Sequence, residues 1–276
     1  MATALAAAYM NIPLAHTMGG EVSGTIDESI RHAVTKFAHI HFPACSEARD
    51  RIIKMGERPD DVYLVGCPRI DLVAEILRQD GGAIEGGIFD EGVGTTVDLN
   101  RPFVMVSQHP VTTEYGGGER QITDTLLAIQ DTRVPALVFW PNADAGSEDV
   151  ARGIRKFREH QDTSHMHFFK NLPAEAYIQL MRRTACLVGN SSSAIREGAF
   201  IGTPAVNIGS RQDMRQRGKN IMDVDHNRGA ISDAVRQQVV HGSYASEPIY
   251  GDGKAGGRIA EILARCEVQI QKRITY

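Results

Sequence analysis

The sequence has no excess of basic residues. Its 276 residues contain 30 lysines and arginines against 34 aspartates and glutamates, which gives a formal net charge of −4. Proteins that bind nucleic acid or an anionic membrane surface usually show a basic excess or a basic patch. Neither class of partner is indicated, so we expect no nucleic acid and no membrane partner, and an anionic ligand would need a local site.

Paired cysteines and long apolar runs are also missing. The four cysteines, Cys45, Cys67, Cys186 and Cys266, form no C-x-x-C pair, which favours thiols in a reducing cytoplasm over disulfides or zinc. No run reaches the ~18 apolar residues that a membrane span requires. The alanine-rich start lacks a basic region and is interrupted early by a proline, so we expect no secretion signal and a cytoplasmic protein.

Short apolar runs instead alternate with amphipathic stretches. Buried strands are predicted at 12–16, 61–66, 102–107, 136–141, 185–189 and 204–209, and helical spacing occupies 25–42, 46–56, 70–79, 119–130, 147–160, 173–183 and 192–201. Nearly continuous apolar strands alternating with helices predict an α/β fold with a parallel sheet covered on both faces. Ligands of such sheets bind at the carboxyl ends of the strands.

A domain boundary is predicted near residue 72. There a helix is followed by a glycine-rich, aperiodic segment at 81–94, which we interpret as a loop without a phosphate-binding pattern. The part before the boundary supplies two strands at most, whereas a nucleotide-binding half usually has about three βα units. Either the first domain is unusually small or the chain is missing its beginning.

Three polar segments follow predicted strands. In GNSSSAIREG (189–198), serines precede a helix, where main-chain N–H groups and hydroxyls suit an anion. Glu197 lies one turn later, in reach of a ribose diol. The alternative is that Ser191 or Ser192 simply caps the helix. The segment PNADAGS (141–147) occupies an equivalent place after another strand and supplies Asp144.

The second segment is SQHPVTTEYG, in which His109 lies just beyond a strand end. An imidazole there suits a diphosphate or the protonation of a leaving group, and the alternative is a structural histidine. The third, HTMGGEVSGTIDESIRHA, places Glu21 and Asp27 at or near a helix start, where a partly desolvated carboxylate can act as a base or merely complement the helix dipole. His39 and His41, two apart on an expected helix, cannot share a metal ion, so no metal site is predicted.

Six motifs occur in one order along the chain: HTMGGEVSGTIDESIRHAVTKFAHIHF, MGERPDDVYLVGCPRID, HPVTTEYG, PNADAGS, GNSSSAIREGAFIGTPAVNIGSRQ and IYGDGKAGGRI. Together they closely resemble the hydrolysing UDP-N-acetylglucosamine 2-epimerases of bacterial sialic acid synthesis, which also form one half of a bifunctional animal enzyme. The resemblance implies a GT-B fold of two Rossmann-like domains with a nucleotide sugar between them. It also makes a homodimer or higher homo-oligomer plausible.

On this resemblance the chain divides into three parts. Residues 1–72 would be the remainder of an N-terminally shortened first domain, 73–253 the nucleotide-binding domain, and 254–276 a helix that crosses back to the first domain.

The resemblance also implies roles for individual residues. Ser191 and Ser192 would hold the diphosphate and Glu197 the ribose. Asn190, Arg196 and Arg211 would complete the substrate-binding set, and the catalytic group would be His16, Glu21, Asp27 and His109.

The implied chemistry needs no cofactor. A base removes the C2 proton of the sugar while UDP departs from C1, and water then adds with inversion at C2 to release N-acetylmannosamine. The animal-type pattern has a catalytic carboxylate where this chain has Met18. A thioether cannot move protons, so catalysis would rest on Asp27, on Glu21 or on an acid outside this chain.

Three alternatives stay open. The chain is a GT-B glycosyltransferase, a catalytically silent nucleotide-sugar binder, or an epimerase acting on a related UDP- or GDP-linked amino sugar.

Overall fold

The computed structural model describes residues 1–79 and 86–275, which form two compact units. The first comprises Met1–Glu75, Met214–Gln216 and Pro248–Tyr276, and the second comprises Ile76–Asp213 and Arg217–Glu247. Each unit has its own sheet, so each is described separately.

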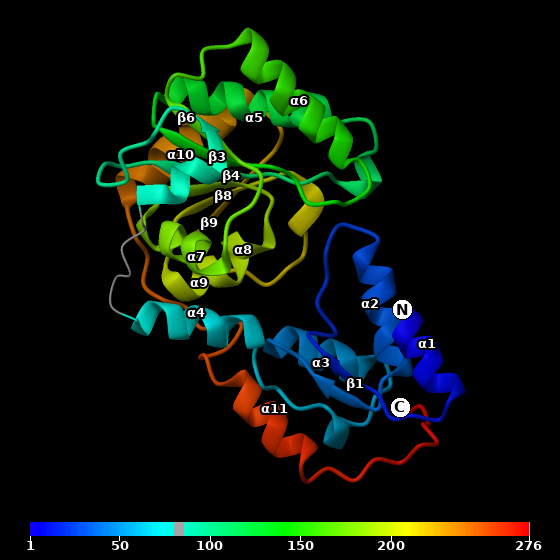
Figure 1. Cartoon of the computed structure of the whole chain (residues 1–276). Helices are drawn as coiled ribbons and strands as arrows, with labels where there is room; N and C mark the ends of the chain where they lie inside the picture. Colours follow the sequence, from blue (N-terminus) through cyan, green and yellow to red (C-terminus); the bar gives the residue numbers. More distant parts are fainter. Residues whose placement is uncertain (80–85, 276) are drawn as a thin grey trace. The chain divides into compact units, whose positions relative to one another are not determined.

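The first unit contains a two-stranded parallel sheet and helices. Its elements are α1 (Ala2–Tyr9), β1 (Ala15–Thr17), α2 (Asp27–Phe37), β2 (Ile40–Phe42), α3 (Ser46–Lys54), the 3-10 turn η1 (Pro59–Asp61), the start of α4 (Pro68–Arg78), and α11 (Ala255–Leu263) (Figure 1). In the sheet His16 of β1 lies opposite His41 of β2. The register therefore fixes where the predicted histidine stands.

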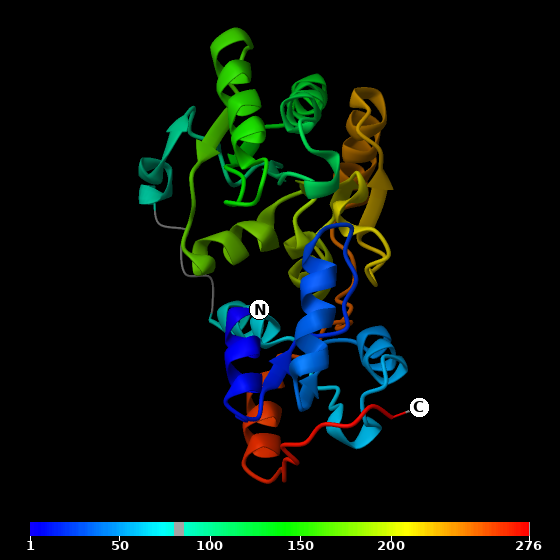
Figure 2. The ribbon, with the colours of Figure 1, turned by 90° about the vertical axis from the view of Figure 1, so that its right-hand side faces the viewer.

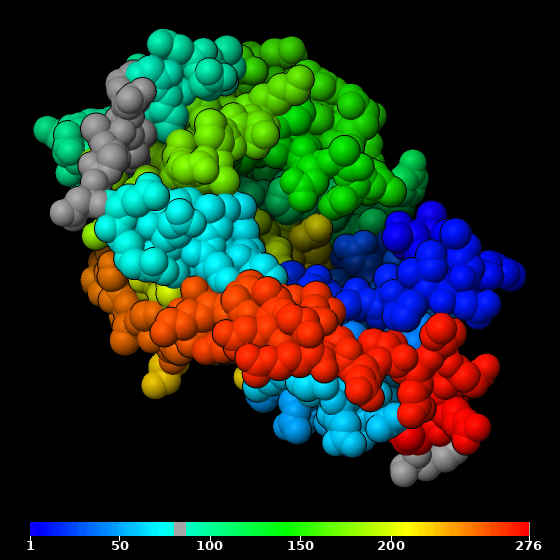
Figure 3. Space-filling model, turned by 60° about the horizontal axis from the view of Figure 1, so that its bottom comes forward, coloured from blue at the N-terminus to red at the C-terminus, as the bar shows by residue number. Residues whose placement is uncertain are grey.

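The core of the first unit joins strand β2 to the C-terminal helix α11. Ile40, Phe42 and Val65 are buried together, and Ile259 and Ile262 of α11 pack against them. The segment after α11, red in Figure 3, then runs along the surface of this unit. Burial of these apolar side chains ties the C-terminal segment to β2.

The second unit is built on a seven-stranded sheet in the order β3-β6-β5-β4-β7-β8-β9, with β3 antiparallel and the other strands parallel. The strands are β3 (Gly92–Gly94), β4 (Val104–Ser107), β5 (Ala136–Phe139), β6 (Met166–Phe169), β7 (Cys186–Gly189), β8 (Ala205–Ile208) and β9 (Ile221–Val224). The helices are α5 (Gly118–Thr132), α6 (Ser147–His160), α7 (Ala174–Arg183), α8 (Ser192–Ile195), α9 (Glu197–Ile201) and α10 (Arg228–His241), with 3-10 turns at Gly86–Glu91, Thr112–Glu114 and Ser210–Gln212.

Helices cover both faces of this sheet (Figures 1 and 2). Val104 and Val106 of β4 belong to the core shared with α5, α6 and α10, whereas Met105 between them belongs to the core shared with α7. Both faces of each central strand are thus buried, which is why these strands are apolar at successive positions rather than at alternate ones. The predicted α/β class with a parallel sheet is confirmed.

Most of the predicted elements are present. The strands predicted at 102–107, 136–141, 185–189 and 204–209 are β4, β5, β7 and β8. The strand predicted at 12–16 is β1, which begins three residues later and ends one residue later. The helix predicted at 70–79 is α4. The helix predicted at 192–201 is divided into α8 and α9 at Arg196, whose φ and ψ are −87° and −67°.

Several expectations were wrong. The run at 61–66 is not a strand: only Val62 forms a bridge, to His41, and Leu64 is 49% exposed. The helix expected over 25–42 ends at Phe37, and 40–42 is strand β2. Like β2, strands β6 and β9 were not predicted. In the segment predicted as a loop at 81–94, residues 81–85 lie outside the described residues, and the rest forms a 3-10 turn and β3.

Candidate active site

The order of strands in the second unit indicates where a ligand would bind. From β4 the chain proceeds outward to β5 and β6 on one side, and from β7 to β8 and β9 on the other. The carboxyl ends of β4 and β7, which pair directly, therefore form the switch point where open α/β sheets bind ligands. His109 follows β4 and Asn190 follows β7, so the two strongest predicted motifs meet there.

Asn190 locks the two strand ends together. Its side-chain Oδ1 accepts from the main-chain N–H of His109 at 2.7 Å, and its Nδ2 donates to the carbonyl of His109 at 2.9 Å. Its own carbonyl accepts from Nη1 of Arg211 at 3.3 Å and from Nε2 of Gln212 at 2.8 Å. Asn190 is fully buried, so this predicted substrate-binding residue holds the protein's own loops in place.

The His109 imidazole is fixed in one neutral tautomer. The main-chain N–H of Asn142 donates to Nδ1 at 3.1 Å, which makes Nδ1 an acceptor and puts the ring proton on Nε2. Burial, assisted by the charge of Arg211, lowers the pKa of His109 to about 3. Near neutral pH the ring is therefore an uncharged donor through Nε2, and Ser107 Oγ lies 3.5 Å from that atom.

Of the three serines, Ser191 caps the helix, Ser193 bonds to that cap, and Ser192 is held by an arginine. Ser191 is the N-cap of α8 and accepts from the main-chain N–H of Ser193 at 3.4 Å, and their hydroxyls are 2.8 Å apart. Tyr177 Oη lies 3.1 Å from Ser193 Oγ. Ser192 Oγ instead accepts from Nη2 of Arg196 at 2.9 Å. Ser191 therefore caps the helix, as the alternative interpretation expected, and Ser192 places a hydroxyl beside a cation.

Charged groups surround this segment. Glu197 is 5% exposed, and its Oε2 lies 3.9 Å from Nε of Arg196. Arg211 is paired through Nη2 with Oδ2 of Asp144 at 3.1 Å. Glu114 accepts from Ser210, the residue before Arg211. Contacts thus join His109, Asn190 and Arg211 in one group and Ser192, Arg196 and Glu197 in another, and Ser191 lies between them in sequence. Glu197 presents little surface to a ribose.

The other predicted catalytic residues belong to the first unit. His16 stands on β1, and its Nδ1 lies 3.3 Å from Oγ1 of Thr35 on α2. Burial, together with neighbouring His41 and Arg31, lowers the pKa of His16 to about 4. Asp27 is exposed in the first turn of α2, where it complements the helix dipole.

Glu21 has a different environment from Asp27. It is 3% exposed and pairs with Arg215, itself 7% exposed, at 2.8 Å, and its carbonyl accepts from Nη1 of Arg31 at 3.0 Å. A buried ion pair holds a carboxylate as a counterion, so Asp27 is the more available proton acceptor of the two. Met18 has a left-handed backbone with φ of 59°, and its sulfur lies 3.5 Å from Sγ of Cys67.

Comparison with known proteins identifies the family. Residues 1–264 match the family described as UDP-N-acetylglucosamine 2-epimerase. The chain belongs to the UDP-N-acetylglucosamine 2-epimerase family. It is 32% identical over 263 residues to UDP-N,N'-diacetylbacillosamine 2-epimerase (hydrolyzing) of Legionella pneumophila and 29% identical over 266 residues to UDP-N-acetylglucosamine 2-epimerase of Neisseria meningitidis serogroup B. These alignments cover 95% and 94% of this chain, and the chain spans 67% of each relative.

Solved structures support the fold. The UDP-GlcNAc 2-epimerase of Neisseria meningitidis bound to UDP-GlcNAc has a TM-score of 0.79 at 17% identity, and the Methanocaldococcus jannaschii enzyme in complex with UDP-GlcNAc and UDP has 0.78 at 15%. Each comparison covers 95% of this chain and 72% of the other. The GT-B class expected from the motifs is confirmed by these structures.

Several contacts of this epimerase-family chain were not predicted from its sequence. Asn142 acts through its main chain, which leaves no side-chain signal. Arg215 lies far from Glu21 in sequence and in no quoted motif, so nothing linked the two. Arg31 contacts the main-chain carbonyl of Glu21, so the side chain at position 21 gave no signal for this contact.

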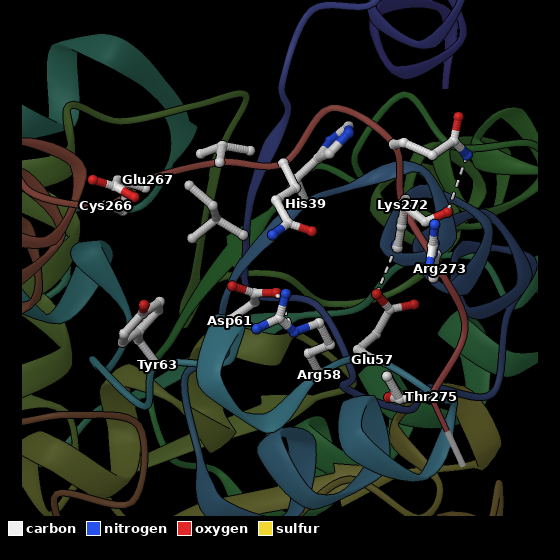
Figure 4. Close-up of a pocket in the computed structure, with 14 residues that line it drawn as sticks. His39, Glu57, Arg58, Asp61, Tyr63, Cys266, Glu267, Lys272, Arg273 and Thr275 are labelled. Atoms are coloured by element: carbon white, nitrogen blue, oxygen red, sulfur yellow. Dashed lines mark hydrogen bonds and ion pairs between the residues drawn. The ribbon is translucent and has the colours of Figure 1, made fainter.

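A separate pocket of about 500 Å³ lies in the first unit and contains none of the predicted site residues. Several of its polar side chains are paired: Figure 4 shows Lys272 contacting Glu57, 2.6 Å away, and Arg58 lies 3.6 Å from Asp61. His39 contacts the carbonyl of Ile270 at 3.1 Å. The Lys272–Glu57 pair and the His39 contact thus hold the C-terminal segment.

The metal prediction was argued on a wrong premise. His39 and His41 are at strand β2, not on a helix, and His41 contacts Glu57 at 3.1 Å. Over residues 1–79 and 86–275, no three His, Cys, Asp or Glu side chains are grouped so as to hold a metal ion. None of the helices that the structure describes combines the length and apolarity needed to span a bilayer.

Proposed function

We propose that this chain is a hydrolysing epimerase that converts UDP-N-acetylglucosamine and water to N-acetylmannosamine and UDP. The observation that carries the proposal is the meeting of His109 with Asn190 and the serine segment at the switch point of the second unit. Family membership supports the substrate class, since two relatives are named for UDP-linked acetamido sugars.

The reaction is an elimination followed by an addition. A base takes the C2 proton, the C2–H electron pair becomes the C1=C2 bond, and the C1–O bond breaks with its electrons leaving on UDP. Water then supplies hydroxide to C1 and a proton to the opposite face of C2. The C2 proton is weakly acidic, so stabilising charge on the departing diphosphate lowers the barrier most effectively.

Residues of the second unit are assigned to the diphosphate. Neutral His109 donates from Nε2 to the leaving oxygen, and Ser192 and Arg196 offer an adjacent hydroxyl and cation. Arg211 and Ser191 complete the anion site, and Glu197 contacts the ribose. Asn190 supports this set by fixing the main chain of His109.

Residues of the first unit are assigned to proton transfer at the sugar. Asp27 is the proposed base because it is an exposed carboxylate without the arginine partner that holds Glu21. His16 is the second acceptor, and Glu21 orients Arg215. No cofactor is needed for this chemistry, and a cytoplasmic homo-oligomer remains part of the proposal.

Incubation with UDP-N-acetylglucosamine in deuterated water tests the proposal. The expected products are UDP and N-acetylmannosamine that carries deuterium at C2. Binding of UDP without turnover would favour the silent binder, and transfer to an added sugar acceptor would favour a glycosyltransferase. Either result would reject the epimerase proposal for this chain.

A second substrate is favoured by one specific observation. The Legionella relative, which is named for UDP-N,N'-diacetylbacillosamine, is slightly more similar to this chain than the meningococcal UDP-N-acetylglucosamine enzyme is. The same chemistry applies to both sugars, because C1 and C2 are alike. A parallel assay with both UDP-sugars distinguishes them by the ratio of their kcat/KM values.

A further inference from the structure

The contact between His16 and Thr35 determines which nitrogen of His16 carries the ring proton. Thr35 Oγ1 lies 3.1 Å from the carbonyl oxygen of Arg31, four residues earlier on α2, and 3.3 Å from Nδ1 of His16. A carbonyl can only accept, so the single hydroxyl proton of Thr35 is used there. Toward His16 the hydroxyl must then accept, which places a proton on Nδ1.

Packing makes this contact rigid. Thr35 is fully buried, and a Cβ added to Gly19 would lie 2.8 Å from Nδ1 of His16 and 3.1 Å from Oγ1 of Thr35. Only glycine leaves room for the pair at this position. Nζ of Lys272 also donates to the carbonyls of Thr35 at 3.1 Å and Lys36 at 2.8 Å, which fixes the main chain of α2 at this point.

The opposite nitrogen is left available. Nε2 of His16 has no hydrogen-bond partner within the described part of the chain and is not one of its buried, unpaired atoms. The charged and titratable groups around the ring are Arg31 and His32 of α2, His41 of β2 and the amino terminus. All are cationic or neutral, so they disfavour a second proton on the imidazole.

We propose that Thr35 is a positioning residue that holds His16 as the Nδ1–H tautomer and so presents the Nε2 lone pair as a hydrogen-bond acceptor for the acetamido N–H or a hydroxyl of the sugar. The identity of this donor depends on the function proposed above. The tautomer does not, because it follows from contacts within the first unit alone.

Nitrogen-15 NMR of the histidine-labelled full chain tests the tautomer directly, with the His16 signals assigned by their loss in His16→Gln. We expect the wild type and Thr35→Ser to show a protonated Nδ1 and a bare Nε2. Thr35→Val should shift the population toward Nε2–H. A wild-type ring protonated mainly on Nε2, or an unchanged tautomer in Thr35→Val, would overturn the proposal.

Kinetics then separates positioning from a purely structural effect. Thr35→Val should lower kcat/KM by about 10-fold, as expected for one misdirected hydrogen bond, and Thr35→Ser should restore it. Thr123→Val is the matched control, because Thr123 makes the same bond to the carbonyl four residues back at 2.7 Å on α5. An equal loss in Thr123→Val would reject the role in binding, whereas absence of turnover in the wild type would reject the proposed function and leave the NMR result intact.

Discussion

The main-chain N–H of Asn142 donates to Nδ1 of His109 across 3.1 Å. Because a main-chain N–H cannot accept, this single contact excludes a proton on Nδ1 in the folded state. The imidazole therefore presents Nε2–H. Adding a second proton, at Nδ1, would break this hydrogen bond and would bury a positive charge. Burial and the charge of Arg211 lower the pKa of His109, and the contact with Asn142 fixes the tautomer of the neutral ring.

A pH dependence of stability follows from His109. Its pKa is about 3 in the folded protein and 6.5 unfolded, so the unfolded state takes up the proton first and stability falls as the pH drops below 6.5. Between pH 7 and pH 5 this group should remove about 2 kcal/mol from the free energy of unfolding.

Urea unfolding at the two pH values measures this loss. His109→Gln keeps an oxygen that accepts from Asn142 and should lose about 2 kcal/mol less than the wild type over the same range. Equal losses in both proteins would mean that His109 is protonated normally in the folded state.

Ser192 offers the second prediction. Its hydroxyl lies beside the Arg196 guanidinium, so Ser192→Ala should raise the Kd for UDP by roughly 10-fold, the effect expected for a hydrogen bond to a charged group. Isothermal titration calorimetry measures the Kd. Ser164→Ala is the control, since Ser164 precedes β6 at the amino edge of the sheet and should bind UDP normally. Unchanged affinity in Ser192→Ala would remove Ser192 from the anion site.

Gly189 offers a structural prediction at the same position. It ends β7 with φ of +130°, and an added Cβ would lie 2.2 Å from the carbonyl oxygen of Ser107 on β4. Gly189→Ala must therefore separate the two strand ends, and we expect a loss of about 3 kcal/mol in stability together with weaker UDP binding.

Gly242→Ala isolates the backbone-strain part of that effect. Gly242 also has a positive φ, +75°, but nothing lies within 4 Å of its added Cβ, so it should lose only about 1 kcal/mol and leave UDP binding unchanged. Chemical unfolding of both variants gives the comparison. Similar losses would show that backbone strain, not crowding against Ser107, decides the cost.

The central strands were predictable because each is buried on both faces and is therefore apolar throughout. Strands β6 and β9 were missed because they lack this signal: histidines flank and interrupt β6, and β9 is an edge strand that carries Asp223. Strand β2 was missed because its apolar residues continue the helical spacing of α2, and only the extended backbone of Ala38 ends that helix.

The site was predictable where side chains of a recognisable motif follow a strand, as with His109 and the serines. It was not predictable where a contact depends on tertiary packing. The Thr35 contact with His16 and the pairing of Glu21 with Arg215 join segments that only the fold brings together. The sequence therefore identified candidate groups but not their tautomers or partners.

Glu57 is a buried carboxylate that binds Lys272 of the C-terminal segment. It is 2% exposed and contacts Lys36 at 2.5 Å, Lys272 at 2.6 Å and His41 at 3.1 Å. Burial alone would raise its pKa, but the hydrogen bonds from His41, Lys272 and Lys36 outweigh it and lower the pKa to about 2. The stabilising effect is therefore complete above pH 4.5 and is lost as the pH falls toward 2.

Glu57→Gln should cost about 3 kcal/mol at pH 7, because two lysines lose their buried counterion, and the difference from wild type should shrink at pH 3. Urea unfolding at both pH values measures it. Asp60→Asn is the control, since the Asp60 side chain is 88% exposed and 3.9 Å from Arg58 and should change stability little. A difference that is independent of pH would contradict the low pKa of Glu57.

Met18 stands where the animal-type pattern has a catalytic carboxylate. Under the proposed function, proton removal by this chain therefore depends on Asp27. If Asp27 is the base, Asp27→Asn should reduce kcat and the rate of deuterium incorporation at C2 by 100-fold or more, the usual contribution of a general base. Because Asp27 is exposed, stability and UDP affinity should stay unchanged. Glu28→Gln, the next residue on the same helix turn, should retain activity. Equal losses in both variants would assign the effect to the negative charge at the start of α2 rather than to proton transfer by Asp27.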